Sequence, residues 1–212
     1  MTTDGGARNL REQAAADART RILEAAVDCI VRDGLAQVRM ASIARTAGVS
    51  SGLLHYHFDT KELLFGEVLT YSHAMSAELN DRALEDAGDG PAEQLSSFLD
   101  RCLPSDEQRA HEWLLWQELA LLCVRDPHLA KVSAALYEDL YTTITDIIRD
   151  GVTAGVFTTT LDPRALAETA VALTDGLGER VLANDPGLGL EQARSTIATM
   201  VGVLVGHDGP LP

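Results

Sequence analysis

The chain has 212 residues, of which 46% are hydrophobic, so it can bury a core and is not expected to be disordered. Because aromatic residues make up only 5% and prolines number seven, the abundance of Ala, Leu and Val favours helices over a β-sandwich or barrel, and we expect an all-α fold. No apolar run reaches the roughly 20 residues of a membrane span and no apolar signal segment opens the chain, so we expect a cytoplasmic protein without membrane contact.

The formal charge of −15 is divided unevenly along the chain. Residues 1–64 carry 8 Lys+Arg and 8 Asp+Glu, whereas the remainder carries 9 and 24. A neutral segment whose cations share one side can approach phosphates, while an acidic body is repelled by them. The charge pattern therefore predicts two domains, residues 1–64 and 65–212, with any nucleic-acid contact in the first.

The three cysteines, Cys29, Cys102 and Cys123, are far apart and show no paired spacing. This arrangement predicts buried free thiols and neither a disulfide framework nor a zinc site. We expect no metal and no cofactor.

The predicted helices begin with residues 18–32, where Ile22, Ala26 and Ile30 recur on one face and Gly34 supplies a stop. Residues 1–17 are expected to form a flexible arm. Two short helices follow, at about 40–48 and 51–58, and Ser50 is a good N-cap for the second.

A long helix is predicted from about residue 60 to 87, because Asp59 and Glu62 have the spacing of a capping box. Beyond Pro91 the breaks "LPSD", "RDP", "TTTLDP" and "NDPGLG" separate further helices. We place these at about 91–103, 106–125, 127–155, 162–184 and 189–206.

The segment "GVSSGLLHYHFDTKELL", residues 48–64, concentrates potential ligands. On a helix His55 and His57 point about 200° apart and cannot bind one metal ion, and no spacing here resembles a catalytic arrangement. Leu54 and Phe58 form one apolar face. The opposite face carries rings and a glycine but no charge, which suits a DNA groove better than the alternative of an ordinary amphipathic helix.

The stretches "ARTRILEAAVDCIVRDG" and "SIARTAGVSSGLLHYHFDTKELL" resemble the N-terminal DNA-binding domain of TetR-family transcriptional regulators over about residues 18–64. The resemblance implies a helix-turn-helix with Ile43, Ala44, Ala47 and Val49 in its interior. It also implies a recognition helix carrying Ser51, Gly52, Leu53, His55 and Tyr56, with His57 and Lys61 on the phosphate backbone.

One part of the pattern differs from the family. Met40 and Ala41 stand where members often have a threonine or a basic residue, so we expect Arg39, Ser42 or Arg45 to supply that DNA contact. In the N-terminal arm, Arg8 and Arg11 either contact a neighbouring groove or form a solvated tail.

In "HEWLLWQELALLCV", tryptophans share one stripe and leucines cover most of the rest, which predicts a helix buried nearly all round. Gln117 lies in the stripe and would need a hydrogen-bond partner there. Tyr137 and Tyr141 lie one turn apart on the next long helix. The predicted ligand-binding residues are Trp113, Trp116, Gln117, Tyr137 and Tyr141; the alternative is that they only pack the core.

The "W..W.E" helix followed by "RDP.L" is similar to the ligand domain of the subgroup that includes the choline-responsive BetI regulators. Excess carboxylates with tryptophan faces favour a cationic or amphipathic inducer. The alternative is that the carboxylates only keep the domain soluble.

Residues 162–206 are expected to form the dimer contact, a four-helix bundle across a twofold axis with Gly178 and Gly202 at close approaches. The predicted seam consists of Leu166, Leu173, Leu177, Ile197, Met200 and Leu204. Together these features predict a homodimeric repressor, not an enzyme, that releases a palindromic double-stranded DNA operator when a small-molecule inducer binds. The alternatives are an all-helical small-molecule-processing enzyme and a helical interaction protein without DNA affinity.

Overall fold

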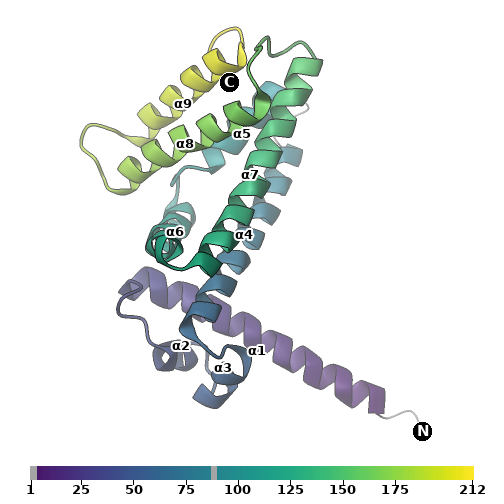
Figure 1. The fold of residues 1–212 in the computed structure, drawn as a ribbon, viewed down its shortest axis with the longest axis vertical. Helices are drawn as coiled ribbons and strands as arrows, with labels where there is room; N and C mark the ends of the chain where they lie inside the picture. Colours follow the sequence, from purple (N-terminus) through teal and green to yellow (C-terminus); the bar gives the residue numbers. More distant parts are fainter. Residues whose placement is uncertain (1–3, 87–89) are drawn as a thin grey trace. The chain divides into compact units, whose positions relative to one another are not determined.

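The computed structural model describes the backbone of residues 4–86 and 90–212 and the side chains of residues 12–77 and 90–212. Throughout this part of the chain the regular structure is helical, which confirms the all-α prediction (Figure 1). The helices are α1 (Asp4–Asp33), α2 (Met40–Thr46), α3 (Ser51–His57), α4 (Lys61–Asp86), α5 (Pro91–Arg101), α6 (Glu107–Arg125), α7 (Pro127–Thr153), α8 (Pro163–Leu182) and α9 (Leu190–Val205). Among the described residues, every helix is too short or too polar to cross a membrane.

The chain divides into two compact units. The N-terminal unit consists of residues up to Ser72 together with Leu114–Ser133, and the C-terminal unit of His73–Trp113 and Ala134–Pro212. Helix α6 contributes residues to both units.

Helix α1 begins at Asp4, well before the predicted start at Ala18, and so includes residues 4–17 of the expected flexible arm. The sequence here contains Ala14–Ala16, and the Gln13 side chain donates a hydrogen bond to Asp17 one turn later (3.1 Å). Alanines and such i,i+4 pairs both favour helix. The side chains of Arg8 and Arg11 lie outside the described residues.

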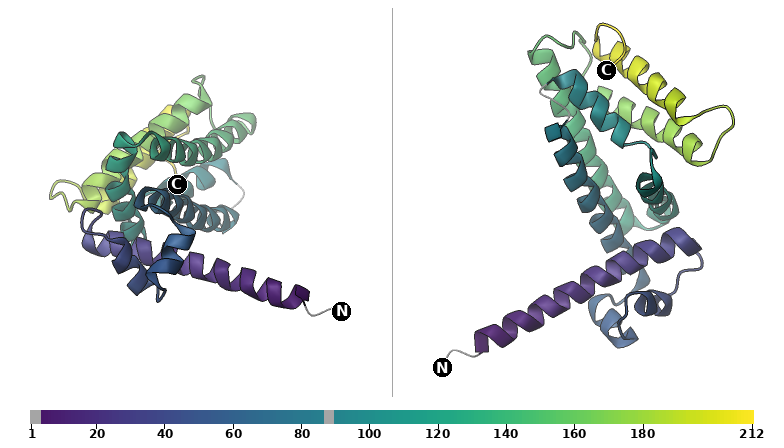
Figure 2. Two further views of the ribbon diagram at one scale, coloured as in Figure 1. Left: turned by 60° about the horizontal axis from the view of Figure 1, so that its bottom comes forward. Right: turned by 180° about the vertical axis from the view of Figure 1, so that it is seen from behind.

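Helices α2 and α3 pack against each other and against α1, as both views in Figure 2 show. Ile22, Ile30 and Cys29 of α1 are fully buried, as are Ile43 of α2 and Leu54 of α3. The predicted interior residues Ala44 and Ala47 are also buried, and Val49 is half-buried.

Helix α4 is capped by a different residue from the one predicted. The Thr60 hydroxyl accepts a hydrogen bond from the Leu63 N–H (3.2 Å), which makes Thr60 the N-cap. The capping box assigned to Asp59 and Glu62 is therefore wrong by one residue.

Helices α8 and α9 form an antiparallel pair, side by side in both figures, and pack with α5 and α7 around the core of the C-terminal unit. Leu166 and Ile197, predicted at the dimer seam, are buried in this core. Gly178 faces the Trp113 ring, and Gly202 faces the segment at Gly209. The close approaches predicted for these two glycines thus occur within one chain.

Helix α6 is buried on one face only, contrary to the prediction. Leu115 and Leu119 are buried, whereas Leu121 and Val124 are exposed. Gln117 is exposed as well, so water can satisfy its amide. Because leucines surround the helix, its sequence did not distinguish the packed face from the open one.

Candidate nucleic-acid interface and inducer site

The helix-turn-helix of the N-terminal unit is closed by a tight turn between α2 and α3. Gly48 adopts φ +65°, a left-handed conformation that favours glycine, and the Val49 N–H donates to the Ala44 carbonyl (3.0 Å). The Ser50 hydroxyl then accepts from the Leu53 N–H (3.1 Å), which starts α3 as predicted.

One face of α3 is packed and the other is open. Leu54 and Phe58 are buried, at 0% and 2% exposure, whereas the Tyr56 side chain is 79% exposed. Of the other predicted recognition residues, those that lie exposed are Ser51, Gly52 and His55, and Leu53 is half-buried.

His57 differs from the other predicted contacts. Its ring lies edge-on to the Tyr56 ring, with centroids 5.3 Å apart. Its Nε2 atom is buried and has no hydrogen-bond partner among the described residues. A phosphate contact through this nitrogen would require the ring to turn.

The cations predicted to contact DNA differ in their surroundings. Arg39 and Arg45 are exposed at the start and end of α2, with Ser42 half-buried between them. The Lys61 ammonium instead donates to the Leu35 carbonyl (3.3 Å) and lies 5.1 Å from the Phe65 ring centroid. Arg19 pairs with Glu67 at 2.7 Å.

Three of the predicted inducer residues lie in the C-terminal unit. Trp113 donates through Nε1 to the Cys102 carbonyl (3.2 Å), and its ring packs on Gly178 of α8. The Tyr137 and Tyr141 rings are 5.9 Å apart on α7. Trp116, half-buried, and the exposed Gln117 belong to the N-terminal unit.

Asp175 of α8 joins these aromatic residues and was missed in the sequence. Its carboxylate accepts a hydrogen bond from the Tyr137 hydroxyl (3.3 Å), and it lies one turn before Gly178. Burial raises the pKa of Asp175, an effect that the Tyr137 hydrogen bond partly offsets. Among the described residues no Lys, Arg or His forms an ion pair with it. A carboxylate between leucines in "LTDGL" was the available signal.

Two neighbouring groups describe the surroundings of Asp175: a buried thiol and an arginine on an aromatic ring. Burial raises the pKa of the Cys102 thiol to about 12, with a smaller contribution from the Asp175 charge. The Arg164 guanidinium lies 4.7 Å from the Tyr141 ring centroid, and Glu138 and Glu168 hold it there. One ring of the aromatic group therefore already carries a cation on its face.

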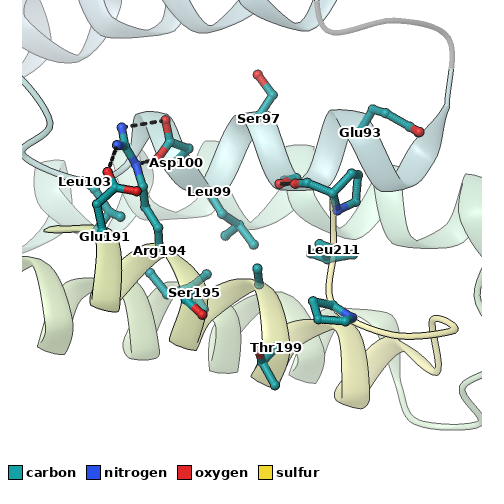
Figure 3. Close-up of a pocket in the computed structure, with 15 residues that line it drawn as sticks. Glu93, Ser97, Leu99, Asp100, Leu103, Glu191, Arg194, Ser195, Thr199 and Leu211 are labelled. Carbon is teal, nitrogen blue, oxygen red and sulfur yellow. Dashed lines mark hydrogen bonds and ion pairs between the residues drawn. The ribbon is translucent and has the colours of Figure 1, made fainter.

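A cavity of about 690 Å³ lies elsewhere in the C-terminal unit, between α5, α9 and the C-terminal segment (Figure 3). Arg194 lines one end of it and pairs with Asp100 and Glu191. The cavity lining contains none of the predicted inducer residues.

Two family models match the chain. That of the "Bacterial regulatory proteins, tetR family" covers residues 22–68, and that of the "BetI-type transcriptional repressor, C-terminal" covers residues 91–206. The chain is 26% identical to the BetI regulator of Agrobacterium fabrum over 84% of each chain. It is 25% identical to that of Stenotrophomonas maltophilia over 59% of this chain, and this match spans 64% of the relative, less than two thirds of its length.

Solved structures agree with these matches. A putative TetR-family regulator from Rhodococcus sp. superposes with a TM-score of 0.79 at 27% identity, over 90% of this chain and 99% of that one. A putative regulator from Saccharomonospora viridis, crystallised in complex with choline, gives 0.79 at 30% identity, over 86% and 94%.

The matched families consist of transcriptional regulators, which confirms the prediction that the chain is not an enzyme. Because the C-terminal model alone covers more than half of the chain, and the N-terminal model covers the helix-turn-helix, the chain belongs to the TetR family of DNA-binding transcriptional regulators, with a C-terminal domain of the BetI repressor type.

Proposed function

We propose that this regulator is a homodimeric repressor that binds a palindromic operator through α3 and releases it when a small organic cation binds in the C-terminal unit. The open face of α3 carries the DNA part of the proposal. An aromatic side chain as exposed as Tyr56 (79%), beside His55 and a glycine, suits contact with base edges and thymine methyl groups.

The proposed contacts divide by chemistry. Residues on the open face of α3 read bases; these are Ser51, Gly52, Leu53, His55 and Tyr56. Arg39, Ser42, Arg45 and Lys61 hold phosphates and so fix the register on the duplex without selecting the sequence. His57 joins them once its ring turns toward the DNA.

The proposed dimer contact stays within residues 162–206 but uses their outward-facing side chains. Met200 is 47% exposed and Val203 69% exposed, about one turn apart on α9, and Ala172 is exposed on α8. Such a face suits a four-helix bundle with a second copy of the chain.

The inducer is proposed to be a small ammonium compound bound near Asp175, Tyr137 and Trp113. A half-buried carboxylate without a cationic partner is costly, and an ammonium ligand would offset that cost while contacting the aromatic faces. The choline bound by the Saccharomonospora viridis relative supports this ligand class.

A titration of operator complexes with choline tests the proposal. The DNA upstream of the gene is the first operator to try, with 3,3-dimethylbutan-1-ol, the uncharged isostere of choline, as control. We expect choline to release the DNA saturably and to change tryptophan emission along the same curve, because a ligand shifts a population only by its preference for one state. Release by neither compound would contradict the inducer assignment.

A further inference from the structure

Leu35, in the loop between α1 and α2, is held on both sides of its backbone. Its N–H donates to the Glu118 carboxylate of α6 (2.9 Å), and its carbonyl accepts from the Lys61 ammonium at the start of α4 (3.3 Å). All three residues belong to the N-terminal unit. The backbone of Leu35 therefore links the Glu118 carboxylate to the Lys61 ammonium.

Within the loop itself, the Gln37 N–H donates to the Gly34 carbonyl (3.1 Å). Gly34, at φ +72°, ends α1, and Val38 is buried at 3% exposure. Arg39 then begins α2 without a side-chain cap. A hydrogen bond to an ionised carboxylate is stronger than one between neutral groups, so Glu118 adds a restraint from outside the loop.

The Lys61 ammonium receives its position from the Leu35 carbonyl and the Phe65 ring. A lysine side chain is flexible, and holding it before binding lowers the entropy lost when it contacts a phosphate. Whatever fixes Leu35 therefore also improves the placement of Lys61.

We propose that Glu118 is a positioning residue for DNA binding, acting through Leu35 on Lys61. The inference rests on the proposed phosphate contact of Lys61. A carboxylate near DNA is otherwise expected to weaken binding by repelling phosphates. Replacing Glu118 should therefore weaken operator binding if it positions Lys61, and should tighten operator binding if it only repels phosphates.

Operator affinity of Glu118 variants, measured by fluorescence anisotropy at one salt concentration, separates the two. We expect Glu118→Ala to weaken binding by up to about tenfold, the equivalent of one hydrogen bond to a charged group. Glu118→Gln should lose less affinity than Glu118→Ala, because its amide oxygen still accepts from Leu35 although it carries no charge. The matched control is Val124→Ala, at an exposed position of the same helix, which should change nothing. Equal tightening in the alanine and glutamine variants would show repulsion alone and overturn the inference.

A double-mutant cycle with Lys61 distinguishes positioning from a general structural role, because a general structural role would not make the effect of Glu118 depend on Lys61. In a double-mutant cycle, Glu118→Ala should add little to Lys61→Ala but should add fully to Arg45→Ala. Glu118→Ala should also reduce the salt dependence of binding, by up to the slope of one phosphate contact. Additivity with Lys61→Ala would overturn the inference.

Two further outcomes have distinct meanings. If Glu118→Ala fails to fold by circular dichroism, Glu118→Asp gives the same test, since it keeps the charge but withdraws the acceptor; wild-type affinity for it would overturn the inference. If Lys61→Ala alone leaves affinity and salt dependence unchanged, the proposed phosphate contact of Lys61 fails, and the inference fails with it.

Discussion

Gly178 shows how one missing side chain shapes the C-terminal unit. A Cβ atom at this position would lie 2.4 Å from the Trp113 ring, so the indole could pack here only against glycine. We predict that Gly178→Ala lowers the free energy of unfolding by about 1–3 kcal/mol through overpacking. Urea denaturation followed by circular dichroism measures the loss.

Gly176 provides the matched control for that prediction. It lies on the same helix, and a Cβ there would meet nothing within 4 Å. Gly176→Ala should therefore raise the free energy of unfolding by up to about 1 kcal/mol, as helix propensity predicts. Similar destabilisation of both variants would show that the Trp113 contact is not the cause.

If Asp175 is the counter-ion of the inducer, binding should depend on pH. Its pKa is raised by burial, so its carboxyl group is neutral at low pH and becomes charged as pH rises through that raised value. Choline has a permanent charge, and we predict that its affinity increases with pH over this range. Asp175→Asn should bind choline weakly at every pH, as measured by tryptophan emission. A wild-type pH profile in that variant would exclude Asp175 as the counter-ion.

Single residues differ in how far the sequence revealed them. The open face of α3 was predictable because Leu54 and Phe58 mark the packed face on a helical wheel. Asp175 and Glu118 were missed because an isolated carboxylate on a helix usually faces water. Their roles depend on partners far away in the sequence, Tyr137 and the backbone of Leu35, which no local pattern encodes.

At the scale of the element, the start of α4 depends on Thr60. Its hydroxyl satisfies the Leu63 N–H, one of the donors that a helix leaves free in its first turn. We predict that Thr60→Ala lowers the free energy of unfolding by about 1 kcal/mol, and Asp59→Ala by clearly less. Thermal unfolding of the two variants compares them; a larger loss for Asp59→Ala would restore the capping box assigned from sequence.

Helix α9 presents one face to the core and another to its surroundings. Val201 and Val205 are buried, whereas Val203 is 69% exposed. Val203→Asp should produce monomers by analytical ultracentrifugation and weaken operator binding, since an unpaired charge would be buried at the proposed interface. Ser195→Asp, at an exposed position that lines the cavity, is the control and should remain dimeric. A dimeric Val203→Asp variant would place the interface elsewhere.

Helix existence and most boundaries followed from periodicity and from breaks such as "RDP" and "NDPGLG". Helices α5 to α9 lie within two residues of their predicted limits. The faces of α6, α8 and α9 were harder to predict. Leu166 and Ile197 have the spacing of a seam, but the chain buries them in its own core, because a core stripe and an interface stripe have the same period.

At the scale of the whole molecule, the uneven distribution of charge along the chain matches the two proposed binding partners, DNA and a cationic inducer. The first 64 residues are neutral and contain the helix-turn-helix, whereas the acidic remainder contains Asp175 and the aromatic residues around it. This distribution favours phosphate contact by the first part and cation attraction by the second. The two family models cover residues 22–68 and 91–206.

The most direct measurement compares the wild type and Tyr56→Ala on an operator duplex and on a scrambled duplex of equal length, by fluorescence anisotropy at increasing salt. The account predicts that the wild type prefers the operator and weakens as salt rises. Tyr56→Ala, with its fold intact by circular dichroism, should lose about 1–3 kcal/mol of that preference while keeping its affinity for the scrambled duplex and its salt slope. An unchanged preference in Tyr56→Ala would contradict the reading of the operator by the open face of α3.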